Sequence, residues 1–286
     1  MNRRFVTVDV FTETPLAGNP LAVVLEAEGL DGARMQAIAR EFNLSETVFV
    51  LPPADDRHRA RLRIFTPAAE LPFAGHPIVG TAAVLGIEQG GGDKIFGLEI
   101  DAGITPCVTE ARGDGRAYAR FRAPRVPEKL PGKVSPEDAA AALGLDVDDI
   151  GETAKWSAGN PFDLIELASL EALAKARPNA RFDATFPQAF LFFRVEGWTW
   201  WRARVFAPAL GIAEDPATGS AAAAFAGLVH ARALPGEGDH DIVVEQGVEM
   251  GRPSKIAVQL VCRAMRLEGV EIGGDVVVMS EGKLRA

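Results

Sequence analysis

Short stretches in which hydrophobic and polar residues alternate recur along the whole chain, with the two-residue period typical of β-strands. In the first half these stretches are Phe5–Phe11, Leu21–Leu25, Thr47–Leu51, Arg59–Phe65 and Ile95–Ile100. In the second half they are Leu164–Leu167, Ala189–Val195, Arg202–Phe206, Ile242–Gln246 and Ile256–Cys262. The pattern predicts a strand-rich protein in both halves.

Two predicted helices, His76–Gly86 and Ser220–Ala233, consist almost entirely of small and apolar residues. A helix that is apolar on all sides is expected to be buried. We therefore predict that strands enclose each of these helices. A more ordinary helix is predicted over Asp31–Phe42, with Asp31 as its N-cap, and another begins after Ser135.

The sequence contains an internal repeat with an offset of 141 residues. Gly18-Asn19-Pro20 recurs as Gly159-Asn160-Pro161, and Arg63–Ala68 recurs as Arg204–Ala209. Two matches at one offset, in the same order, predict two similar halves that face each other. A cleft between such halves is a natural site for a small molecule.

The segment Ala123–Val134 contains three prolines and a glycine, which is the composition of a linker. It predicts an N-terminal domain over residues 1–125 and a C-terminal domain over residues 126–286. The last strand of the second domain could instead pack back on the first half.

Composition narrows the class of protein. The 286 residues are 48% hydrophobic and 24% charged, as in ordinary globular proteins, and the formal charge is −9. Because nucleic acids and anionic membranes bind basic surfaces, the charge argues against both as partners. No stretch of 18 apolar residues occurs, and the opening MNRRFVTVDVF lacks the apolar core of a secretory signal. These features predict a cytoplasmic protein.

No cofactor or metal is predicted. The four histidines never stand at ligand spacing from one another or from Cys107 and Cys262, which we expect to be buried free thiols. Neither of the glycine-rich phosphate motifs, GxGxxG or GxxxxGK[ST], occurs.

Glu46 is the first candidate for chemistry, because it stands where a predicted helix gives way to an apolar strand. Desolvation among apolar neighbours raises the pKa of a carboxyl group, which suits it to take and return a proton near neutral pH. The alternative is a solvated loop carboxylate or a cap for its own turn. The repeat offset pairs this position with Pro187, next to Gln188, so only the first half offers a carboxylate.

The start of the first small-residue helix carries Gly75 and His76, followed by Pro77. The first N–H groups of a helix have no partners within it, and with the positive end of the dipole they bind anions. His76 can donate to a carboxylate or relay a proton. The alternative is a histidine that only caps the helix.

The start of the second small-residue helix carries Asp215, Thr218, Gly219 and Ser220. Asp215 can orient an acid or a substrate group, and the other three can offer hydroxyl and backbone donors to a carboxylate. The alternative is an ordinary N-cap, a role that Asp, Thr and Ser all favour. Two helix starts aimed at one cleft would hold an anion and stabilise an enolate-like charge.

Four segments carry a family resemblance: VDVFTETPLAGNPLAVV, NLSETVFV, RIFTPAAELPFAGHPIVGTAAVLG and VFAPALGIAEDPATGSAAAAFAGLV. The chain resembles the phenazine biosynthesis-like (PhzF) family, of the diaminopimelate epimerase-like fold, from Val8 to Ser254. The resemblance implies two pseudo-symmetric α+β halves, each a bent mixed sheet or barrel around a central helix, and a homodimer. It also implies a biosynthetic, cofactor-independent isomerase that moves a proton on a small conjugated carboxylate, of the trans-2,3-dihydro-3-hydroxyanthranilate isomerase type.

The resemblance implies catalytic roles for Glu46 as the acid/base, His76 and Asp215. The expected substrate-binding residues are Asn19, Ser45, Gly75, Thr218, Gly219 and Ser220. Racemases of this fold use a cysteine at each helix entry, and this chain has none there. Three alternatives remain open: a non-catalytic small-acid-binding protein, an epimerase or racemase of an amino acid-like substrate, and a hydrolase using Ser220, which lacks the GxSxG context.

Overall fold

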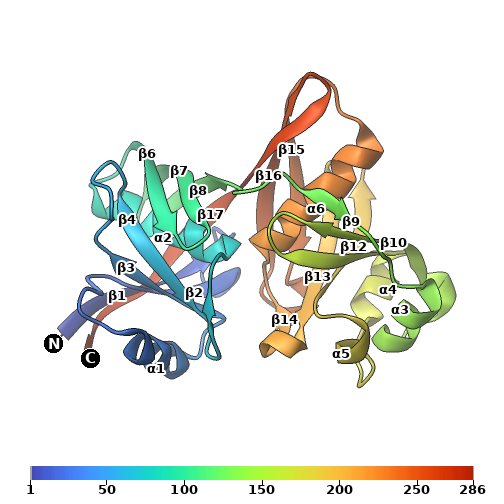
Figure 1. The fold of residues 1–286 in the computed structure, drawn as a ribbon, viewed down its shortest axis with the longest axis horizontal. Helices are drawn as coiled ribbons and strands as arrows, with labels where there is room; N and C mark the ends of the chain where they lie inside the picture. The colour runs from blue at the N-terminus through green and yellow to red at the C-terminus, as the bar shows by residue number, and fades with distance from the viewer. Residues whose placement is uncertain (1, 286) are drawn as a thin grey trace. The chain divides into compact units, whose positions relative to one another are not determined.

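The computed structural model describes residues 2–285, which form two compact units (Figure 1). Unit 1 comprises the residues up to Pro124 and those from Ile272 onward, and unit 2 comprises Arg125–Glu271. The domain predicted over residues 126–286 therefore ends at Glu271, because the last strand crosses into unit 1.

Unit 1 is a closed barrel with a helix inside it. Its strands pair in the ring β1–β2–β3–β4–β6–β7–β8–β17 and back to β1, with β2–β3 and β4–β6 parallel. The elements are β1 (Asn2–Val10), β2 (Asn19–Val24), α1 (Gly32–Phe42), β3 (Glu46–Leu51), β4 (Ala60–Phe65), β5 (Glu70–Leu71), α2 (Gly75–Glu88), β6 (Asp93–Ile100), β7 (Gly103–Gly113), β8 (Arg116–Arg122) and β17 (Arg266–Arg285).

Unit 2 repeats this topology. The pairs β10–β11, β12–β13 and β15–β16 are antiparallel, and β11–β12 and β13–β15 are parallel, as in their counterparts of unit 1. The helices are α3 (Pro136–Leu143), α4 (Leu170–Lys175), α5 (Phe182–Thr185) and α6 (Gly219–Ala233), with 3-10 turns at Val147–Asp149, Pro208–Leu210 and Val248–Met250. The strands are β9 (Glu128–Leu130), β10 (Ile150–Ser157), β11 (Pro161–Leu167), β12 (Ala189–Glu196), β13 (Trp200–Ala207), β14 (Ile212–Asp215), β15 (Gly238–Gln246) and β16 (Ser254–Arg263). The predicted fold class is confirmed.

The small-residue helices are buried at the centre of their units, as predicted. Helix α2 contacts β1, β2, β3, β6, β7 and β8, and α6 contacts β9, β10, β11 and β16. Close packing explains the small side chains: a Cβ atom added at Gly80 would lie 2.6 Å from a methyl carbon of Leu21 and 2.8 Å from one of Val10. In α6, Phe225 packs against the rings of Phe190 and Phe192.

The repeat extends to an ion pair in each unit. Arg63 and Glu70 form a bidentate pair with an Nε–Oε1 distance of 2.6 Å. Arg204 and Glu214 form the same pair at 2.8 Å. Each pair joins the strand that carries the arginine to the short antiparallel strand after it. Both units therefore have the same ion pair just before the central helix.

The strand registers correct one sequence expectation. Thr47 pairs with Phe65 in unit 1, and Ala189 pairs with Phe206 in unit 2. Because Phe65 and Phe206 are repeat counterparts, the residue that corresponds to Glu46 is Gln188, not Pro187. The unit 2 linker before β12 is one residue longer, which shifts the offset from 141 to 142 at this point.

Candidate active site

Glu46 is the first residue of β3 and is 7% exposed. Helix α1 ends just before it, with Asn43 as a left-handed C-cap, and the chain turns directly into the strand. Strand β3 lies between β2, where Leu21 is the partner of Glu46, and β4. The chain therefore anchors a buried carboxyl group at one end of the barrel, where the sequence predicted it.

His76 is the second residue of α2 and is 3% exposed. Its Nε2 atom lies 3.4 Å from Oε2 of Glu46. Burial lowers the pKa of His76 to about 3, so the imidazole is neutral at physiological pH. Ala74, the N-cap residue, makes no side-chain cap bond to this helix start, and the first N–H groups of a helix can bind an anion.

Asn19 completes the group in unit 1. It begins β2, is fully buried, and its Nδ2 atom lies 3.2 Å from Nδ1 of His76. The structure thus brings Asn19, Glu46 and His76 together, with Ser45 and Gly75 adjacent to them in the chain. Asn19 contacts the histidine, and its role as a substrate-binding residue stays a prediction.

A second group forms at the start of α6 in unit 2. Asp215 ends β14 and is 7% exposed, and its Oδ2 atom accepts a 2.5 Å hydrogen bond from the Thr218 hydroxyl. Thr218 occupies the N-cap position without capping the helix through its side chain. Gly219 and Ser220 follow as the first residues of α6, both buried. The predicted residues of the second helix start therefore lie together.

Gln246 belongs to this second group and was not predicted. It is fully buried at the end of β15. Its Oε1 atom accepts from the Thr218 N–H at 3.1 Å, and its Nε2 donates to the Asp215 carbonyl at 2.7 Å and to the Thr218 hydroxyl at 3.1 Å. The one available sequence signal was a glutamine ending an apolar strand, directly before a glycine.

Each group lies at the N-terminal end of the central helix of its unit. Each combines a buried carboxylate with helix N–H groups, so each can hold an anion and a proton acceptor close together. That Glu46 and Asp215 face one shared cleft remains a prediction.

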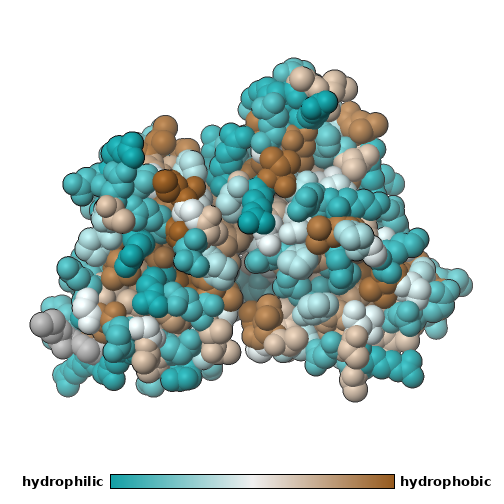
Figure 2. Space-filling view, viewed as in Figure 1, coloured by the Kyte–Doolittle hydropathy of each residue, from teal (hydrophilic) through white to brown (hydrophobic). Residues whose placement is uncertain are grey.

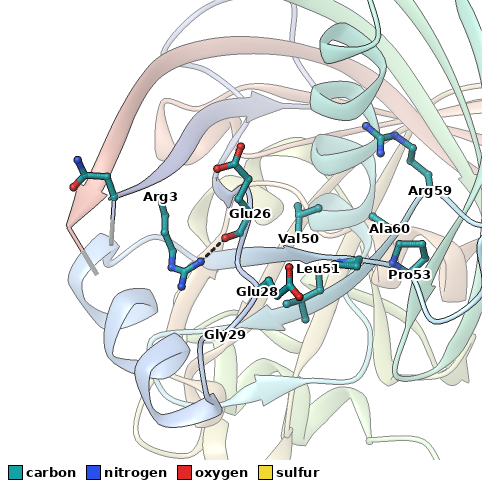
Figure 3. A pocket seen from close by; sticks show the side chains of 11 residues that line it. Arg3, Glu26, Glu28, Gly29, Val50, Leu51, Pro53, Arg59 and Ala60 are labelled. Carbon is teal, nitrogen blue, oxygen red and sulfur yellow. Dashed lines mark hydrogen bonds between the residues drawn. The ribbon is translucent and has the colours of Figure 1, made fainter.

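One cavity lies elsewhere in unit 1. It has a volume of about 700 Å³ and is lined by Arg3, Glu26, Glu28 and the last residues of β3, as Figure 3 shows. The nine-tenths buried Arg3 donates there to the Glu26 carbonyl. Glu46 begins β3 and Leu51 ends it, so this cavity opens at the opposite end of the strand from Glu46.

The structure also bears on metal sites, on the two cysteines and on membrane-spanning helices. No cluster of three or more His, Cys, Asp or Glu residues suited to a metal ion occurs within residues 2–285. Cys107 and Cys262 are buried and free, and burial raises the pKa of the Cys107 thiol to about 12.

Over the described part of the chain, every helix is too short or too polar to span a bilayer. Hydrophilic side chains cover most of the face seen in Figure 2.

Comparison with known proteins points to one family. The sequence model of the family described as phenazine biosynthesis-like protein matches residues 8–282. An uncharacterized isomerase of Mesorhizobium japonicum is 45% identical, over 99% of this chain and 98% of its own. The trans-2,3-dihydro-3-hydroxyanthranilate isomerase of Pseudomonas aeruginosa is 40% identical, over 98% of both chains. The crystal structure of a Bacillus anthracis phenazine biosynthesis protein of the PhzF family superposes with a TM-score of 0.87, at 26% identity over all of both chains.

Proposed function

The chain belongs to the phenazine biosynthesis-like family, and on that premise we propose that it is an isomerase that moves a proton within a small conjugated carboxylic acid. We take trans-2,3-dihydro-3-hydroxyanthranilate, the substrate named for the relative that is 40% identical, as the first compound to test. Glu46 is the proposed acid/base, and no cofactor enters the reaction.

The observation that carries the proposal is the buried pair of Glu46 and His76 at the start of α2. Their side chains are 9% and 4% exposed, and 3.4 Å separates Oε2 from Nε2. Removal from water disfavours the charged form of a carboxyl group, and Glu46 is 7% exposed. A protein that only binds an acid gains nothing from such a group, whereas an acid/base needs a carboxyl group whose charged form is disfavoured.

The proposed reaction conserves atoms and electrons. A Glu46 oxygen removes a proton from a carbon next to the conjugated system, and the electron pair of the broken C–H bond moves into that system. The helix N–H groups near Gly75 and Gly219 stabilise the negative charge that develops towards the substrate carboxylate. The protonated Glu46 then gives the proton to another carbon on the same face.

The other expectations follow from the same proposal. Asp215 positions the substrate from the second unit, with Ser220 and the Thr218 loop as further contacts. The thiols that a two-cysteine racemase needs are absent from both helix starts, which carry Ala74-Gly75 and Thr218–Ser220. The homodimer and the cytoplasmic location stay part of the proposal.

The test is proton exchange during turnover in heavy water. Wild-type protein is expected to convert the substrate, and deuterium should appear at the receiving carbon in those turnovers in which the protonated Glu46 exchanges with solvent before it returns the proton. Glu46→Gln, which gives unit 1 the amide that Gln188 provides in unit 2, should lose at least 10²-fold in rate, the low end for general acid–base catalysis. Glu41→Gln, an exposed glutamate of α1, serves as the matched control and should behave as wild type.

Two outcomes would contradict the proposal. Turnover of the substrate by Glu46→Gln at the wild-type rate would remove Glu46 from the chemistry. Saturable binding of the acid without any turnover would favour a binding protein that shares the fold of the family.

A further inference from the structure

We infer that Asn19 is a positioning residue that holds His76 in the neutral tautomer protonated on Nε2, so that His76 donates a hydrogen bond and only Glu46 carries the moving proton. The part concerning Glu46 rests on the proposed function. The part concerning the tautomer rests on the contacts of unit 1 alone.

The chemistry of the contact sets the tautomer. The Nδ2 atom of an asparagine amide carries two hydrogens and has no lone pair to offer, so it can only donate. It lies 3.2 Å from Nδ1 of His76, which must therefore accept, without a hydrogen of its own. A neutral imidazole with a bare Nδ1 carries its hydrogen on Nε2, the nitrogen that lies 3.4 Å from Glu46.

Burial keeps the imidazole neutral. Asn19 is fully buried and His76 is 3% exposed, so water does not compete for Nδ1. A second proton on the ring would have to displace the amide of Asn19 and would place a cation among buried side chains at this end of the barrel. The charged residues on the strands beside this position include Glu46, whose Oε2 lies 3.4 Å from Nε2, and Asp9, which precedes the Val10 that pairs with Asn19.

The chain holds Asn19 firmly in place. Asn19 pairs with Val10 of β1, and Gly18 before it has a φ of +67°. A Cβ atom at Gly18 would lie 2.4 Å from the Val10 carbonyl oxygen and 2.6 Å from a methyl carbon of Thr12. Only glycine therefore fits at this position without a shift of the backbone. An amide donor fixed in this way is better suited to hold the His76 ring in one orientation than to bind ligands of different shape.

The fixed tautomer gives His76 and Glu46 different roles in the proposed reaction. His76 cannot accept the proton that leaves the substrate, because Nδ1 is occupied by the amide and Nε2 already bears a hydrogen. Nε2 makes no hydrogen bond to any of the described residues, although Oε2 of Glu46 lies 3.4 Å away. Its N–H is therefore available to a Glu46 oxygen or to a substrate oxygen during the reaction.

The direct test is ¹⁵N nuclear magnetic resonance of the wild-type protein without substrate. A scalar coupling between Nδ2 of Asn19 and Nδ1 of His76 across the hydrogen bond is expected, with the imidazole hydrogen on Nε2. The resonances of His76 are identified by their loss in His76→Gln. A hydrogen on Nδ1 in the wild-type protein would overturn the inference, whether or not any variant folds.

The Asn19→Asp variant supplies a second, independent reading. A carboxylate can only accept, so it should move the hydrogen of His76 to Nδ1 and reduce kcat by tenfold or more. The matched control is Asn160→Asp at the counterpart of Asn19 in unit 2, which should leave the His76 resonances unchanged. A folded Asn19→Asp protein with the wild-type tautomer would overturn the inference.

Failure of the proposed function would look different. In that case the coupling and the tautomer would be as expected, while Glu46→Gln would turn over substrate like wild type.

Discussion

Replacing Gln246 with leucine tests how unit 2 holds the start of α6. Leucine has a similar volume but no polar atoms, so the change removes three hydrogen bonds without opening a large cavity. It leaves the Thr218 N–H and the Asp215 carbonyl without these partners beside a fully buried side chain. The Thr218 hydroxyl keeps its bond to the Asp215 carboxylate.

The expected cost follows from the two backbone groups that lose their partners. Each unsatisfied buried polar group costs about 1–3 kcal/mol, so Gln246→Leu should lower the free energy of unfolding by about 2–6 kcal/mol. The loop that carries Asp215 should also lose its fixed position, and kcat under the proposed function should fall by roughly tenfold or more, since small misplacements are costly in catalysis.

Urea unfolding followed by circular dichroism measures the first effect, and substrate turnover measures the second. Gln259→Leu is the matched control, because Gln259 makes an exposed hydrogen bond to Asp241 on the neighbouring strand and its loss should cost about 0.5 kcal/mol or less. If Gln246→Leu were as stable as the control variant, the reasoning about buried partners at the start of α6 would be refuted.

Three further predictions concern packing, charge and pH. Gly80→Ala should lower the free energy of unfolding by about 1–3 kcal/mol, because its Cβ would lie 2.6 Å from a side-chain carbon of Leu21 in β2. The control Gly236→Ala, where a Cβ would have no atom within 4 Å, should leave the melting temperature unchanged. In urea unfolding, Arg204→Lys should lower the free energy of unfolding by about 3 kcal/mol and Arg63→Lys by about 1 kcal/mol or less. The reason is burial: the side chain of Arg204 is 3% exposed and that of Arg63 is 29% exposed. Equal losses in the two variants would contradict this prediction. The pKa of His76 is lowered from 6.5 to about 3 on folding, so the unfolded chain binds the extra proton and stability should fall as the pH drops from 6.5 towards 3; His76→Asn should weaken this slope between pH 7 and 5.

The strands and helices that the sequence predicted are those with strong patterns. The alternation at Arg59–Phe65 and the all-apolar run at His76–Gly86 appear as β4 and α2. The strands β7, β8, β10 and β17 were not predicted, and β9 lies inside the segment interpreted as a linker. In β17, two adjacent glycines and charged residues obscure the alternation, and pairing with β1 and β8 stabilises the strand instead.

The candidate site was predictable where a residue stands beside a recognisable element. Glu46 and His76 each begin an apolar element, so their burial and proximity could be expected from the repeat and the helix start. Gln246 could not, because β15 returns to the start of α6 only through its parallel pairing with β13, a contact between distant segments. The true counterpart of Glu46 was missed for a related reason: a one-residue difference in loop length is visible only in the strand register.

The path of β17 has a consequence for how the protein comes to be made. This strand starts in unit 2 and then fills the gap between β8 and β1, so the first barrel is closed by a segment that is synthesised after unit 2. Until then β1 and β8 are open edges, and open edges invite pairing with other chains. The first barrel, although most of its strands are synthesised before unit 2, can therefore close only after the chain of unit 2 has been made.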